Sequence, residues 1–226
     1  YYFHNKDPKF SIFSNIFFIL SALMIPLGVG TFLDLIGSSA TASAGLSINF
    51  AILFLWYFLS YWFLKYNVFL LFAALTASGL FITFTNLLMG ERPTPAFYEY
   101  RLLILGASLF SFGHYLKENK KEVVSIFYFL GLALLLGSAF ALSVEGVFWQ
   151  FLFPFMIAGA FYSSNFLKNK VVLFLATIFT FIEIGYLTAK YFSQSLGWPI
   201  ALIVAGFSII LVGYLSYGVG KKYAKQ

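Results

Sequence analysis

Residues Val68–Leu75 read VFLLFAAL, and residues Val171–Ala176 read VVLFLA. Neither stretch contains a polar side chain, so a helix formed by either would present apolar atoms on every face. A transmembrane β-barrel needs alternating polar and apolar residues, because one face of each strand meets lipid and the other meets the lumen. The two stretches therefore predict membrane-spanning α-helices.

The composition of the whole chain supports this interpretation. Hydrophobic residues make up 61% of the 226 residues, charged residues make up 10%, and the mean hydropathy is +0.89. A soluble domain carries about 25% charged residues, so this chain could not cover a water-facing surface. We therefore expect an all-α integral membrane protein in which residues 1–226 form a single transmembrane domain with no soluble domain.

The number of spans follows from the length of each apolar run, since a span needs about 20 mostly apolar residues. Short polar, Gly-rich or Pro-containing segments separate the runs. On this basis we expect eight transmembrane helices, at residues 10–36, 47–65, 68–89, 100–117, 122–144, 147–166, 171–192 and 197–219.

Basic residues are distributed unevenly between the two sides of these spans. Eleven of the 14 Lys and Arg residues fall on one side, whereas Arg92, Arg101 and Lys190 fall on the other. Because positively charged loops stay in the cytoplasm, both termini are expected there, in an inner or plasma membrane. This rule also accounts for the net charge of +6 without a nucleic-acid partner. The expected partners are the lipid bilayer and other membrane protein subunits.

The chain also repeats itself. The tripeptide Phe-Leu-Lys at residues 63–65 recurs at 166–168, an offset of 103, while matches nearer the start have an offset of 110 and those nearer the end have 100. This order predicts an internal duplication of residues 10–121 and 122–226. Each half would hold four spans, an even number, so the halves form a parallel repeat, an arrangement that often encloses a cavity between the halves.

One stretch near the end of the chain carries a resemblance. Residues Ser195–Ile203 read SLGWPIALI and are followed by Gly206, Gly213 and Tyr214. This stretch resembles the last span of uncharacterised bacterial multi-span membrane proteins, whose domains have no assigned function. The resemblance implies a multi-span fold and implies no activity and no site residues.

Glu183 lies just past the middle of the expected span 171–192. A carboxyl group inside a membrane is costly and points to function, so one interpretation is a proton or cation site. The alternative is a structural, protonated Glu that is hydrogen-bonded to a neighbouring hydroxyl or carbonyl group. The repeat counterpart of Glu183 is Leu80, so only one half has the acid. Lys190 lies two turns further on, too far for a direct ion pair.

A second candidate is the external loop that holds Arg92, Glu99 and Arg101 among aromatic residues. Arginine beside aromatic rings can bind carboxylates, phosphates or sugars. We favour the alternative, a proline-stiffened cap whose charges pair with each other and with water. His114 is expected at the membrane interface, and Gln150 as a hydrogen bonder between helices.

Other chemistry finds little support. The chain has no cysteine and only two histidines, and it contains no metalloprotease, nucleophile-elbow or phosphate-loop motif, so we expect no metal and no cofactor and place an enzyme last. The leading hypothesis is a non-catalytic scaffold or accessory subunit packed against other membrane proteins, because buried polar residues are scarce. The alternative is a small-molecule or ion transporter with a cavity between the repeats and Glu183 as its proton or cation site.

The expected orientation can be tested with single cysteines. In the chain's own membrane, cysteines placed at Ala96 and at Asn119 should react with an impermeant maleimide from opposite sides, Ala96 from the outside and Asn119 from the cytoplasm. The natural absence of cysteine makes the wild-type chain the background control. Labelling of both positions from one side would refute the eight-span topology.

Overall fold

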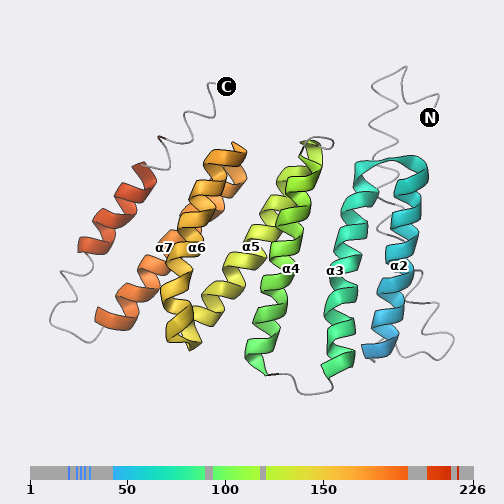
Figure 1. Cartoon of the computed structure of the whole chain (residues 1–226), viewed down its shortest axis with the longest axis horizontal. Coiled ribbons are helices and arrows are strands. Elements are labelled where there is room, and N and C mark those ends of the chain that lie inside the picture. The colour runs from blue at the N-terminus through green and yellow to red at the C-terminus, as the bar shows by residue number, and fades with distance from the viewer. Residues whose placement is uncertain are drawn as a thin grey trace. The chain divides into compact units, whose positions relative to one another are not determined.

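The fold was analysed in a computed structural model of the chain (Figure 1). The structure describes residues 43–89, 94–117, 121–192 and 203–214, together with single positions at 20, 24, 26, 28, 31 and 218. The expected span at 10–36 and most of the expected span at 197–219 lie outside the described residues.

Every element in the described part is a helix, as the composition predicts. The six long helices are α2 (Ser43–Leu64), α3 (Asn67–Met89), α4 (Pro95–Leu116), α5 (Lys121–Glu145), α6 (Val147–Leu167) and α7 (Lys170–Phe192). A shorter apolar helix covers Ile203–Tyr214. Each long helix coincides with one of the expected spans, apart from a few residues at its ends.

Five of these helices, α2, α3, α5, α6 and α7, are long and apolar enough to cross a membrane. Helix α4 is of similar length but does not meet the same hydropathy criterion, and Glu99 and Arg101 lie in its first two turns. The described helices therefore make the chain a multi-pass α-helical membrane protein, while the total of eight spans stays a prediction.

The chain divides into two compact units, residues 1–94 and 95–226. In the first unit, α2 and α3 form an antiparallel hairpin with a small core of its own. Tyr57 of α2 is fully buried in this core, where its ring stacks near Phe69 of α3, and Leu53 and Ala73 complete the cluster. The division at residue 94 concerns packing, and it leaves the predicted duplication untested.

The turns that follow α2 and α6 have the same backbone geometry. Lys65 and Lys168 both lie in the left-handed region of backbone conformation, with φ of 60° and 53°. Residues other than Gly rarely adopt this conformation. The Lys65 amide donates to the Tyr61 carbonyl at 2.8 Å, and the Lys168 amide donates to the Ser164 carbonyl. Both contacts are left-handed C-caps, which satisfy carbonyl groups at a helix end.

In the second unit, α4 and α5 come into close contact through glycines. A Cβ atom added to Gly106 would lie 2.5 Å from the Leu135 backbone nitrogen, and one added to Gly131 would lie 2.5 Å from the Phe110 backbone nitrogen. Helices in lipid associate largely by van der Waals packing, since lipid is as apolar as their side chains, and small residues permit this approach. These glycines therefore hold α4 against α5.

Gly131→Ala should destabilise the second unit, because the new methyl group has to push two backbones apart. Overpacking of this kind costs about 1–3 kcal/mol. The matched control is Gly159→Ala in the middle of α6, where an added Cβ atom meets nothing within 4 Å. Thermal unfolding of the full chain in detergent should show a lower midpoint for Gly131→Ala and an unchanged or higher one for the control. Equal midpoints would show that the close approach contributes nothing.

Candidate functional site

The second unit gathers different polar groups at its two ends. At one end, the Trp149 indole of α6 donates a 3.0 Å hydrogen bond to the Tyr100 hydroxyl of α4. At the other end, Lys117 after α4 lies 5.9 Å from the centroid of the Phe166 ring of α6. Successive helices of this unit therefore alternate in direction. The start of α4, the end of α5, the start of α6 and the end of α7 share the first end, which we call the tryptophan end.

Glu183 of α7 is turned into the second unit, with 4% of its surface exposed. Neither of its carboxyl oxygens has a hydrogen-bond partner among the described residues. A buried polar group without a partner is costly, and it is costlier in a membrane, where water cannot take the partner's place. Glu183 is thus the residue of this unit whose placement most needs an explanation.

The surroundings of Glu183 are aromatic. Phe179 and Tyr186, one turn before and one turn after it, lie on the same face of α7. The Phe179 ring meets Phe153 of α6 with centroids 6.4 Å apart, and the Tyr186 ring meets Phe140 of α5 at 5.5 Å. Phe140 and Phe153 also contact each other, at 5.7 Å. The carboxyl group therefore lies at a level where α5, α6 and α7 pack through rings.

Hydroxyl groups of Ser143 and Thr180 donate within their own helices. Ser143 of α5 donates to the Phe140 carbonyl at 2.7 Å, and Thr180 of α7 donates to the Ala176 carbonyl at 2.7 Å. Both bonds stay within the helix that carries the hydroxyl, a common way for Ser and Thr to satisfy themselves in lipid. The hydrogen bond that the structural interpretation of Glu183 requires is not present in the described part of the chain.

Lys190 lies two turns from Glu183 toward the tryptophan end, and its side chain is exposed. Its ammonium group donates to the Tyr186 hydroxyl at 2.9 Å and to the Gln150 side-chain oxygen of α6 at 3.4 Å. The second contact confirms Gln150 as a hydrogen bonder between helices. Lys190 interacts electrostatically with Glu183 without a hydrogen bond to it, as the spacing along the helix predicts.

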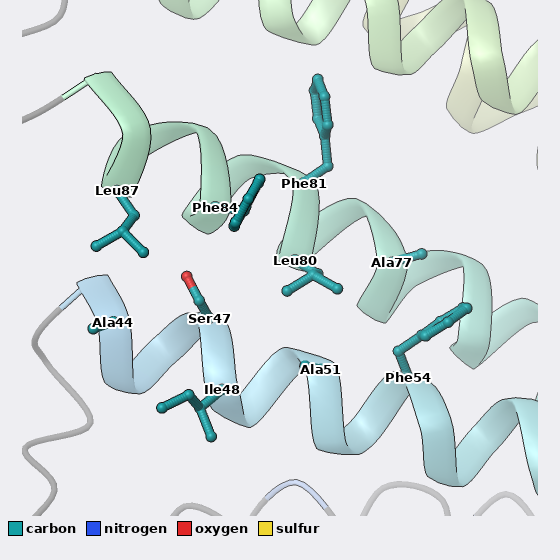
Figure 2. Close-up of a pocket in the computed structure, with 10 residues that line it drawn as sticks. All are labelled: Ala44, Ser47, Ile48, Ala51, Phe54, Ala77, Leu80, Phe81, Phe84 and Leu87. Carbon is teal, nitrogen blue, oxygen red and sulfur yellow. The ribbon is translucent and has the colours of Figure 1, made fainter.

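The first unit has an apolar groove. Figure 2 shows this groove between α2 and α3, with a volume of about 780 Å³ and Leu80, Leu87 and Ser47 among its lining residues. The Ser47 hydroxyl is the one side-chain oxygen drawn among the labelled residues. At the offset of 103, these three positions correspond to Glu183, Lys190 and Gln150. These positions are nearly all apolar on α2 and α3, and their counterparts at this offset are all polar on α6 and α7.

The candidate external loop is far from Glu183 along the chain. Arg92 lies outside the described residues, whereas Glu99 and Arg101 lie in the first two turns of α4. Arg101 is 5% exposed, and its guanidinium group lies 4.6 Å from the Tyr98 ring centroid and 5.1 Å from that of Phe97. Its stacking partners thus come from the first turns of its own helix. His114 is exposed in the last turn of α4.

No group of three or more His, Cys, Asp or Glu side chains in the described residues could hold a metal ion. Sequence reasoning singled out Glu183 but missed the aromatic rings around it and the role of Tyr186. Phe179, Glu183 and Tyr186 do share a helix face by their spacing, but Phe140 and Phe153 come from other helices, whose rotation the sequence does not reveal.

Comparison with protein-family models, with curated proteins and with solved structures finds no match for this chain. The class of the protein therefore rests on the fold itself, which is that of an α-helical multi-pass membrane protein. Within the described residues, the site is defined by a buried carboxyl group on a helix face with aromatic rings, and an exposed lysine lies two turns away.

Glu99 of α4, which is not one of the five apolar helices, tests whether charges come together at the tryptophan end. Burial and the charge of Glu145 raise the pKa of Glu99 above its ordinary value. The folded state therefore holds the proton more tightly than the unfolded state, and stability falls as the pH rises through this range. Glu99→Gln should raise the thermal midpoint in detergent at neutral pH, and the gain should vanish in acid, where Glu99 carries no charge.

Because Glu99 is only partly buried, the gain should be small. Glu145→Gln is the matched variant, since it removes the repelling charge and should give part of the same gain. Parallel pH profiles for wild type and Glu99→Gln would contradict this account of the tryptophan end.

Proposed function

We propose that the chain is a transporter of a small molecule or ion, with Glu183 as the site that binds a proton or cation. The observation that carries this proposal is the burial of Glu183 with both carboxyl oxygens unpartnered. A carboxyl group that stabilised the bundle would be hydrogen-bonded, because otherwise its burial costs folding free energy. A group that must gain and release a charged ligand has a reason to stay without a permanent partner.

The proposal includes an eight-span fold made of two parallel four-helix repeats. Several features of the described helices support the duplication. Helices α2 and α6 end at Leu64 and Leu167, and the helices that follow start at Asn67 and Lys170, all at the offset of 103. The two left-handed lysine caps have the same offset. Three buried residues of α3 also correspond to buried residues of α7: Phe69 to Val172, Leu70 to Leu173 and Ala73 to Ala176.

A duplicated protein can keep one half as support while the other acquires a function. The polar set Glu183, Lys190 and Gln150 occupies positions that are Leu80, Leu87 and Ser47 in the first half. Two ionisable residues, Glu183 and Lys190, were therefore gained by the second half or lost from the first. Because a charge within a membrane is expensive, its presence in one half only is better explained by use than by packing.

In this proposal the protein resides in an inner or plasma membrane with both termini in the cytoplasm. Its partner is the lipid bilayer, and nucleic acid is not among its partners. Lys117 and Lys168 belong to turns at the end opposite the tryptophan end, which supports a cytoplasmic assignment for that end by the positive-inside rule.

A second candidate is the scaffold or accessory subunit that the sequence favours. The exposed outer face of α2 supports it, with Trp56, Trp62 and Phe63 exposed by 56%, 67% and 76%. Such a face suits another membrane protein as well as lipid. Purification of the full chain in mild detergent distinguishes the candidates, since a subunit should bring a stoichiometric membrane partner and a self-sufficient transporter should not.

The transport proposal makes a prediction about stability that needs no knowledge of the substrate. Glu183→Leu should raise the thermal midpoint of the full chain in detergent, because it replaces an unpartnered carboxyl group by the residue found at the matching position of the first half. The control is Ile182→Leu on the neighbouring, more exposed position. A structural Glu183 would give the opposite result, a loss of about 1–2 kcal/mol for a broken interhelical hydrogen bond.

The same variants should separate folding from activity. In proteoliposomes with an internal pH-sensitive dye and an imposed proton gradient, wild type should move protons when supplied with a panel of amino acids, sugars, amines and inorganic ions. Glu183→Gln should fold and show the rate of empty vesicles, since an amide keeps the shape but cannot titrate. Equal rates for wild type and Glu183→Gln with every solute would reject Glu183 as the site.

A further inference from the structure

We infer that the ligand of Glu183 is a proton rather than a metal cation, and that it exchanges with water at the tryptophan end through Tyr186 and past Lys190. The inference rests on the proposed function and specifies the ligand of the same site. Three features carry it: the surroundings of the carboxyl group, the line of side chains along α7, and the fixed charge of Lys190.

The surroundings of Glu183 do not suit a metal ion. Hard cations such as Mg²⁺ and Ca²⁺ take about six to eight oxygen ligands at short distance. Here the flanking positions on the same face of α7 are Phe179 and Tyr186, and the side chains packed against those two are the rings of Phe153 and Phe140. With no hydrogen-bond partner for either oxygen of Glu183 in the described residues, the one chemical species that needs no further ligand is a proton.

A path for this proton runs along one face of α7. Glu183, Tyr186 and Lys190 are three and then four residues apart, so their side chains share that face. They pass from buried through half-buried to exposed in the same order. The Tyr186 hydroxyl accepts a 2.9 Å hydrogen bond from Lys190, which leaves its own hydrogen free to be donated, and a phenol hydroxyl can donate and accept at once.

The transfer balances without any other reactant. When the Glu183 side chain turns toward Tyr186, its carboxyl proton passes to the Tyr186 oxygen while the Tyr186 hydroxyl proton passes to water beyond it. The products are a Glu183 carboxylate, an unchanged tyrosine and a hydrated proton. Lys190 keeps its three protons and its charge throughout. Uptake of a proton follows the same steps in reverse.

Lys190 supports the deprotonated state of Glu183. Its exposed ammonium group lies two turns from Glu183 along α7. The helices packed against α7 contribute uncharged side chains here. Phe140 of α5 contacts the Tyr186 ring, Ser143 lies one turn further along α5, and Gln150 of α6 accepts a hydrogen bond from Lys190. A fixed positive charge beside the entrance supports the carboxylate while the proton is away.

The experiment uses dicyclohexylcarbodiimide, an apolar reagent that modifies protonated carboxyl groups within membranes. The full chain in its membrane should be modified at Glu183, as read by peptide mass spectrometry, and an excess of Na⁺, K⁺, Mg²⁺ or Ca²⁺ should not protect it. The path is tested by infrared spectroscopy after transfer to D₂O. The carboxyl band that Glu183→Gln removes should exchange about 10²-fold more slowly in Tyr186→Phe. Tyr191→Phe, on the exposed neighbouring tyrosine, should exchange at the wild-type rate.

The outcomes distinguish this inference from the proposed function. Protection of Glu183 by any of the metal ions would overturn the proton assignment and leave a cation site in place. An unchanged exchange rate in Tyr186→Phe would overturn the path. Lack of modification together with a solute flux that is driven by a metal cation and still depends on Glu183 would overturn the inference alone. If Glu183 is unmodified and the flux does not depend on it, the proposed function fails as well.

Discussion

The absence of water in the hydrocarbon core is the constraint on which this structure depends. A backbone amide or carbonyl group there can be satisfied only by another part of the protein, so the chain forms helices that satisfy their own backbones. The same pressure acts at helix ends and on side chains. The backbone amides of Lys65 and Lys168 donate to carbonyl groups at helix ends that would otherwise lack a partner. The hydroxyl groups of Thr180 and Ser143 donate to carbonyl groups of their own helices.

Packing between helices follows from that constraint. Because lipid is as apolar as a leucine side chain, burial from water supplies little force between helices, and close van der Waals contact has to supply it. The glycines of α4 and α5 bring two backbones together, whereas α5, α6 and α7 meet through aromatic rings. Glu183 lies on α7 between Phe179 and Tyr186, whose rings make these contacts. Glycine packing thus holds the unit together on one side, and aromatic packing accommodates an ionisable group on the other.

Under the proposed duplication, the two halves differ in where they carry polar side chains. The hairpin of α2 and α3 has an apolar groove at positions whose counterparts on α6 and α7 are Gln150, Glu183 and Lys190. The turns that follow α2 and α6 both hold a lysine in the left-handed region, at Lys65 and at Lys168. In the proposed duplication, an ionisable group occupies one half with no change in the left-handed turn that precedes its helix.

The sequence by itself determined the helical class, the positions of the six described long helices and the short breaks between them, because hydrophobic length and local turn chemistry act over a few residues. It also identified Glu183, since a carboxyl group within an apolar run is conspicuous in any arrangement. Only the tertiary structure decided which way each helix is rotated. That rotation buries Glu183, brings Lys190 to Gln150 and Tyr186, and surrounds the site with Phe140 and Phe153. Helices that are apolar on every face carry almost no signal for rotation, because lipid and a neighbouring helix make the same demand on their side chains.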